Sequence, residues 1–197
     1  MNMPIRQFPT QIFVEIALCI ALAAVLNAVR IFQMPYGGTV SLVMLPLIVI
    51  ALRRGVLAGM IAGAGYGLIE LMIEPMIVHP AQVLLDYPLA FGALGLAGIF
   101  HAKWQRGVLA NRAKDAIWSA VLPAVIVATF ARYVFHAASG YIFFAEYAPE
   151  GQPVIVYTLL YNLFVPVSAL GVFAAAAVVL PALARHGFPQ SDSRSSR

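Results

Sequence analysis

Residues 115–139 of the sequence read DAIWSAVLPAVIVATFARYVFHAAS. As a helix this stretch is long enough to cross the apolar core of a bilayer, which takes about 20 residues. Arg132 and His136 lie four residues apart in it, so they share one helix face. A charged group that faces lipid is costly. We therefore expect this face to look into a cavity or at a partner residue.

The rest of the chain is as apolar as this stretch. Hydrophobic residues make up 62% of the 197 residues and charged residues only 10%, whereas a soluble domain carries about a quarter charged residues. Apolar runs follow one another almost from end to end, which is typical of a polytopic membrane protein. We expect one integral-membrane domain, residues 1–197, without a cleavable signal, because no small-residue cleavage site follows the first run.

The apolar runs predict an all-α fold with six transmembrane helices. Their expected ranges are 11–29, 39–52, 55–73, 81–100, 115–139 and 154–184. The second run is unusually short, and the sixth exceeds the roughly 20 residues that a crossing needs. The polar tail, residues 188–197, is expected to be disordered.

The basic residues support this topology. Ten of the 12 Lys and Arg residues fall on one side of a six-span arrangement: Arg6, Arg53, Arg54, Lys103, Arg106, Arg112, Lys114, Arg185, Arg194 and Arg197. Arg30 lies on the other side, and Arg132 lies within a span. The positive-inside rule then places both termini in the cytoplasm. Because topology explains the positive charge, we expect no nucleic-acid partner.

Three ionisable residues map to the outer half of neighbouring spans: Asp86, Arg132 and His136. They could form an ion pair that only holds two helices together, or they could line a ligand pocket that opens outward. Aromatic residues crowd the same region: Tyr133, Phe135, Tyr141, Phe143, Phe144, Tyr147, Tyr157 and Tyr161. They could form an interfacial aromatic belt. A carboxylate among aromatic faces also suits a cationic ligand.

Asn162 adds an amide that suits an aminopyrimidine-like edge. On a regular helix it points about 140° away from Tyr157, so both reach one pocket only if the pocket is wide or the helix irregular. Small residues recur every four positions at Gly59, Gly63 and Gly67, and again at Ala17 and Ala21, residues that let helices approach closely. Spacing alone does not decide whether these surfaces pack inside the chain or against another subunit.

Several common catalytic patterns are missing from the sequence. There is no P-loop for ATP, no serine nucleophile motif and no metal-binding cluster, since His79, His101, His136 and His186 are scattered. We therefore expect neither an enzyme nor a metal site.

The chain resembles the thiamine-specific S components of energy-coupling factor transporters over essentially its whole length. The resemblance rests on EIALCIALAA (residues 15–24), LPLIVIALRRGVLAG (45–59) and AQVLLDYPLAFGALGLAG (81–98). It continues through RYVFHAASGYIFFAEYA (132–148) and VYTLLYN (156–162). The order and spacing of these motifs together are what make it specific.

The resemblance implies a six-helix vitamin-binding subunit in a bacterial or archaeal cell membrane. It captures thiamine on the outer side for ATP-driven uptake, with a transmembrane coupling subunit and two cytoplasmic ATPases as partners and no cofactor of its own. Ala17 and Ala21 match the alanine motif that faces the coupling subunit. The implied ligand contacts are Asp86, Tyr87, Arg132, His136, Gly140, Phe144, Tyr157 and Asn162.

The sequence departs from this family in its stacking residues. Phe144 stands where a Trp can occur, and the PYGG turn lacks a Trp that some members have near Gly37. Trp104 and Trp118 both map to the cytoplasmic side. The aromatic contacts must then come from Phe and Tyr, or the ligand is a related pyrimidine or another vitamin.

We expect Arg132 and His136 on one wall of the pocket and Asp86 on the opposite wall. Arg132 should repel a cation, so we expect it to pair with Asp86 or with the hydroxyl end of the ligand. Two other functions remain open. The chain could be a standalone proton-coupled transporter in which Asp86 or His136 titrates. It could also be an intramembrane enzyme with these two residues as an acid–base pair, although no nucleophile or metal accompanies them.

Overall fold

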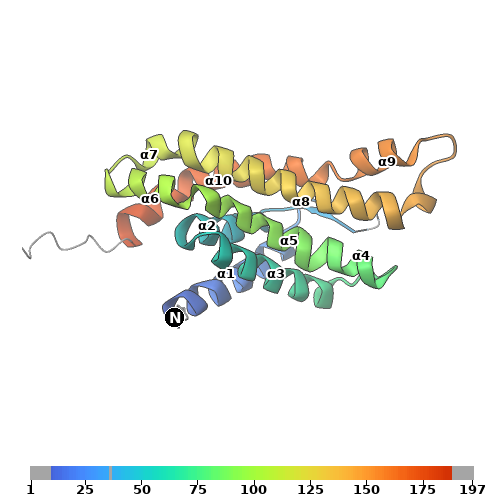
Figure 1. The fold of residues 1–197 in the computed structure, drawn as a ribbon, viewed down its shortest axis with the longest axis horizontal. Helices are drawn as coiled ribbons and strands as arrows, with labels where there is room; N and C mark the ends of the chain where they lie inside the picture. The colour runs from blue at the N-terminus through green and yellow to red at the C-terminus, as the bar shows by residue number, and fades with distance from the viewer. Residues whose placement is uncertain (1–9, 36, 188–197) are drawn as a thin grey trace, which may run out of the picture.

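The computed structural model describes residues 10–35 and 37–187 of the chain. The tail, residues 188–197, for which we expected disorder, lies outside the described residues, as does Arg6. The described part is an elongated helical bundle (Figure 1). Helix α1 begins and α10 ends at the same end of the bundle, beside α6 and α7, as an even number of crossings would require.

Five helical stretches of the described residues are long and apolar enough to cross a membrane. Two are single helices, α1 (Thr10–Ala28) and α3 (Val56–Ile73). The third joins α4 (Pro80–Leu84), the π-helical η1 (Leu85–Leu89), α5 (Ala90–Gly92), the 3₁₀-helical η2 (Ala93–Phe100) and α6 (His101–Leu109). The fourth joins α7 (Ala113–Ala116), the π-helical η3 (Ile117–Val121) and α8 (Leu122–Phe143). After the short 3₁₀ turn η4 (Ala145–Tyr147), the fifth comprises α9 (Val154–Tyr161) and α10 (Phe164–Gly187). This is a multi-pass membrane protein.

The second expected span differs from the prediction. Its first residues form β2 (Thr39–Val40), which pairs antiparallel with β1 (Phe32–Gln33), and its remainder forms α2 (Met44–Arg54). At 1.5 Å per residue, the 11 residues of α2 extend about 16 Å, roughly half of the apolar bilayer core. Most of its side chains are buried, from Met44 to Leu52. The apolar side chains of α2 therefore pack mainly against the rest of the protein and not against lipid.

The glycine series of α3 packs inside the bundle. A side chain at Gly63 would collide with the backbone carbonyl of Phe91, and one at Gly67 would collide with the carbonyl of Tyr87. These contacts place α3 directly against the third spanning stretch, where η1 lies. The close approach fixes the position of η1 and, with it, the position of Asp86.

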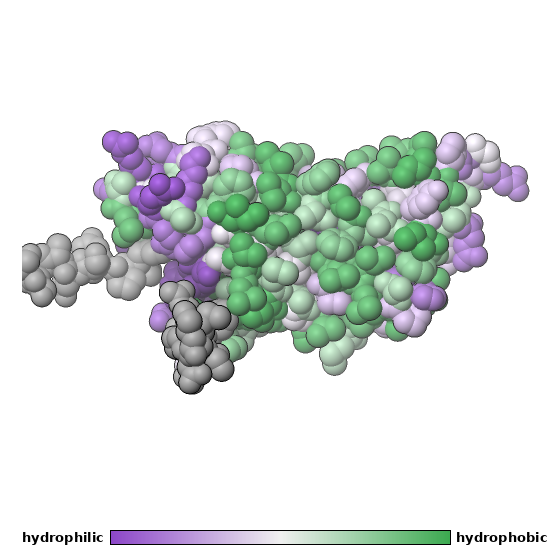
Figure 2. All heavy atoms as spheres, in the orientation of Figure 1, coloured by the Kyte–Doolittle hydropathy of each residue, from purple (hydrophilic) through white to green (hydrophobic). Residues whose placement is uncertain are grey.

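The surface divides along the length of the bundle. Hydrophobic residues cover the middle of the face shown in Figure 2, and hydrophilic residues gather at its two ends. A band of this kind is what a lipid-embedded bundle requires, because lipid cannot hydrate polar side chains. The loop segment around α6 and α7 carries Lys103, Arg106, Arg112 and Lys114 at one of these ends.

Candidate functional site

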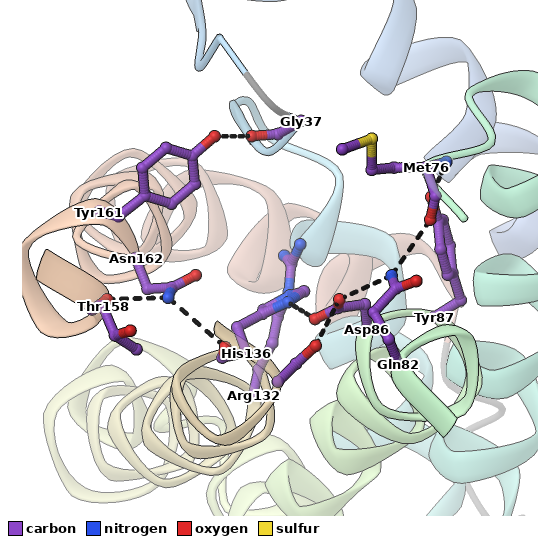
Figure 3. Close-up of polar contacts among 11 residues, drawn as sticks. Gly37, Met76, Gln82, Asp86, Tyr87, Arg132, His136, Thr158, Tyr161 and Asn162 are labelled. Atoms are coloured by element: carbon purple, nitrogen blue, oxygen red, sulfur yellow. Dashed lines mark hydrogen bonds and ion pairs between the residues drawn. The ribbon is translucent and has the colours of Figure 1, made fainter. Parts of the chain in front are cut away.

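A pocket of about 900 Å³, measured out to its open mouth, lies among α3, η1, α8, α9 and the turn between β1 and β2. All eight residues that the sequence predicted as ligand contacts line it. The described lining residues are Asn27, Gly37, Gly38, Thr39, Val43, Glu70, Glu74, Met76, Gln82, Asp86, Tyr87, Phe91, Arg132, His136, Gly140, Phe144, Tyr157, Thr158, Tyr161, Asn162 and Phe164. Figure 3 shows how the polar members meet.

Asp86 lies in η1, where Pro88 removes a backbone donor and the helix widens into a π turn, a distortion common at functional sites. Three side chains donate hydrogen bonds to its carboxylate. Gln82 Nε2 and Ser139 Oγ reach Oδ2 at 2.9 and 2.7 Å, and His136 Nδ1 lies 2.9 Å from Oδ1. Asp86 is thus held firmly between its own helix and α8 (Figure 3).

His136 connects Asp86 to Arg132. The Nε of Arg132 donates to His136 Nε2 at 3.2 Å. Because a guanidinium N–H can only donate, Nε2 must be the accepting nitrogen, and Nδ1 then carries the proton that goes to Asp86. The chain Arg132–His136–Asp86 therefore fixes one neutral tautomer of the imidazole.

Arg132 is only 5% exposed, and its guanidinium lies 4.2 Å from the centre of the Phe91 ring, a cation–π arrangement. One of the two expected partners of Arg132 is excluded here, and one expectation about Asp86 is corrected. Among the described residues Arg132 forms no direct ion pair with Asp86, because His136 lies between them. Asp86 is also not on the wall opposite His136, since the two are hydrogen-bonded neighbours.

Asn162 reaches the pocket through a break in the last span. Helix α9 ends at Tyr161 and α10 begins at Phe164, so Asn162 lies between two helices rather than within one. Its Nδ2 donates to the carbonyl of Thr158 at 2.9 Å, with a longer contact of 3.5 Å to that of His136. The sequence analysis predicted that Tyr157 and Asn162 can share one pocket if the helix is irregular, and the helix is interrupted here.

Two tyrosines hold loops over the site. The hydroxyl of Tyr87 accepts from Met76 N at 2.8 Å and donates to Glu74 O at 2.9 Å. The hydroxyl of Tyr161 donates to Gly37 O at 2.9 Å. Tyr87 therefore offers its ring to the pocket, while its hydroxyl is committed to the loop that precedes α4.

The aromatic lining is only partly what the sequence predicted. Of the crowded aromatic residues, Phe144, Tyr157 and Tyr161 line the pocket. Tyr133 donates instead to the carbonyl of Leu159, and Phe143 stacks on His79. Two further rings, Phe91 and Phe164, line the pocket and escaped the sequence analysis because they sit in ordinary apolar runs.

Several polar lining residues were also missed, above all Glu70. Its Oε2 accepts from Asn27 Nδ2 at 2.9 Å and from Tyr66 Oη at 2.5 Å. The four-residue spacings Tyr66–Glu70 and Gln82–Asp86 were available as signals, because such pairs share a helix face. Glu70 lies near a helix end, where a carboxylate needs no special explanation, so it did not stand out.

Ala17 and Ala21 lie outside the pocket, on α1. Both are exposed, and the large side chains Val14, Leu18 and Val25 on the same helix are exposed as well. This α1 surface, which we call the alanine face, is not used for packing within the described part of the chain.

A family model described as "Thiamine transporter protein (Thia_YuaJ)" matches residues 13–190. The thiamine transporter ThiT of Bacillus subtilis (strain 168) is 38% identical over 152 residues, which cover 76% of this chain and 79% of that protein. The thiamine transporter ThiT of Lacticaseibacillus paracasei (strain ATCC 334) is 30% identical over 194 residues, covering 94% and 91%. A solved structure of ThiT from Listeria monocytogenes superimposes with a TM-score of 0.76 at 29% identity, over 90% of this chain and 95% of that one.

Proposed function

This chain belongs to the thiamine transporter protein family, and from that premise we propose that it is the thiamine-binding S component of an energy-coupling factor importer. It captures thiamine at the outer face of a bacterial or archaeal cell membrane. It carries no cofactor, and separate ATPase subunits hydrolyse ATP. The observation that carries the proposal is that all eight predicted contacts line one and the same pocket.

The polar groups of this pocket match the two halves of thiamine. Asn162 uses its Nδ2 for backbone carbonyls, so its Oδ1 is placed to accept from the amino group of an aminopyrimidine. The rings of Phe144 and Tyr157 supply faces for stacking. Aromatic faces and carboxylates elsewhere in the lining suit the positive charge of a thiazolium.

The alanine face is the proposed contact with the transmembrane coupling subunit. Ala17 and Ala21 leave a shallow surface on α1, and in membranes such surfaces allow close helix–helix packing. Glu15, one half-turn before Ala17, forms ion pairs with Arg53 and Arg54. These ion pairs hold α1 against the end of α2. The alanine face of α1 stays available for contact with another subunit.

Uptake into proteoliposomes tests this proposal against the alternative of a standalone secondary transporter. The chain alone should bind thiamine without accumulating it, with or without a proton gradient. Accumulation should require the coupling subunit, both ATPases and ATP. Proton-driven accumulation by the chain alone would reject the S-component assignment and favour a role for Asp86 or His136 in proton coupling.

A further inference from the structure

Glu70 is a pocket carboxylate that keeps one oxygen without a hydrogen-bond donor among the described residues. It lies on α3 and lines the pocket. Its two partners, the amide of Asn27 and the hydroxyl of Tyr66, both donate to the same oxygen, Oε2. Two donors on one carboxylate suit the ionised form, and the second oxygen, Oε1, accepts no hydrogen bond from the described residues.

The other two pocket carboxylates have cationic compensation. Glu74 forms an ion pair with Arg30, which lies outside the pocket lining. Asp86 is joined through the neutral His136 to Arg132. Each of these units is neutral as a whole.

The remaining negative charge is most accessible at Glu70, because hydrogen-bond donors occupy both oxygens of Asp86 but only one oxygen of Glu70 among the described residues. Three carboxylates and one guanidinium line the pocket, and the ion pair of Arg30 with Glu74 removes one further negative charge. The described pocket keeps one net negative charge, which a monovalent cation would neutralise. Arg132 opposes such a ligand less than an uncompensated guanidinium would, because its charge is balanced in part by the Phe91 ring and, through His136, by Asp86.

We propose that Glu70 is the counter-ion for the positively charged ring of the ligand and sets the preference of the pocket for cationic over neutral ligands. This inference rests on the proposed function. Glu70 lies on α3 and accepts a hydrogen bond from Asn27 of α1. A charged ring paired with its carboxylate therefore lies toward α1 and α3. The uncharged hydrogen-bonding ring then lies toward α8 and α9, where His136 and Asn162 meet.

Titration calorimetry on the full chain tests the proposal with two ligands of matched shape. The first is thiamine, and the second is its neutral analogue in which a thiophene replaces the thiazolium. Glu70→Gln keeps an oxygen that can accept from Asn27 and Tyr66, so the hydrogen bonds persist while the charge is lost. We expect this variant to bind thiamine about 10–100-fold more weakly and to bind the neutral analogue within about threefold of wild type.

Two further variants control the result. Glu150→Gln removes an exposed carboxylate that does not line the pocket and should leave both affinities within about threefold. Glu70→Asp keeps the charge and should bind thiamine more tightly than Glu70→Gln. Equal losses for both ligands, or no loss for either, would overturn the role of Glu70 while leaving thiamine binding by the wild type intact. Absence of thiamine binding by the wild type would overturn the proposed function together with this inference.

Discussion

Replacing Asp86 by Asn probes the Arg132–His136–Asp86 chain most sharply. The oxygen of the new amide can keep the hydrogen bonds from Gln82 and Ser139, which share Oδ2. Its NH₂ group must then face His136 Nδ1, which carries a proton. If the imidazole changes tautomer to accept there, its Nε2–H faces the Nε–H of Arg132 instead. Either way two donors are opposed.

The expected cost follows from these contacts. An unsatisfied buried donor costs about 1–3 kcal/mol, and a buried charge that loses its partner costs about 3–5 kcal/mol. Part of the Arg132 charge remains compensated by the Phe91 ring. We therefore expect the free energy of unfolding to fall by about 3 kcal/mol, the lower end of this range. For a chain of this size, about 2–4 °C per kcal/mol gives a fall of roughly 6–12 °C in melting temperature in detergent.

The double variant Asp86→Asn with Arg132→Gln isolates the mechanism. The glutamine amide can accept from His136 Nε2–H, so the shifted tautomer becomes satisfied and no buried cation remains. We expect the melting temperature to return to within about 4 °C of wild type. Thiamine affinity should stay about 10–100-fold below wild type. An Asp86→Asn variant as stable as wild type, or a double variant no more stable than the single one, would contradict this role of the Arg132–His136–Asp86 chain. Full recovery of binding in the double variant would remove Asp86 from the ligand contacts.

Three other predictions concern the surfaces around the pocket. Ala17→Trp with Ala21→Trp should abolish ATP-driven uptake but leave thiamine binding by the isolated chain within about threefold, because the alanine face lies outside the pocket; lost binding with normal complex assembly would contradict this. Gly63→Val should destabilise the fold by more than about 3 kcal/mol, since its side chain meets backbone that cannot move away; a melting temperature near wild type would be the contrary result. Gly140→Leu should weaken thiamine binding at least about tenfold with little loss of stability, since a Cβ there lies 3.3 Å from Asn162 Nδ2; unchanged affinity in a titration would show that α9 yields freely.

The sequence predicted a feature of the site where a residue type is costly in lipid and therefore needs a partner. An Arg and a His within an apolar run are expensive in lipid, so the sequence predicted that Arg132 and His136 face either a cavity or a partner residue. The resemblance to a known family added residues such as Gly140 that carry no chemical signal of their own. The second predicted span, 39–52, contains only the short helix α2. Its sequence did not reveal this, because burial in protein and burial in lipid select the same residue types.

The contacts themselves could not be predicted from the sequence. Whether Arg132 reaches Asp86 directly or through His136 depends on the π turn of η1 and on the rotation of α8, neither of which leaves a clear sequence pattern. Glu70 was overlooked for a related reason. Its role depends on which carboxylates already have cationic partners, and the ion pair between Arg30 and Glu74 joins residues 44 positions apart.

We propose that this single chain contains a complete thiamine site, and equilibrium titration of the purified chain with thiamine is the direct test. The experiment uses no ATP and no other subunit, with other vitamins titrated in parallel. We expect saturation at one thiamine per chain. Saturation with a different vitamin and none with thiamine would contradict it.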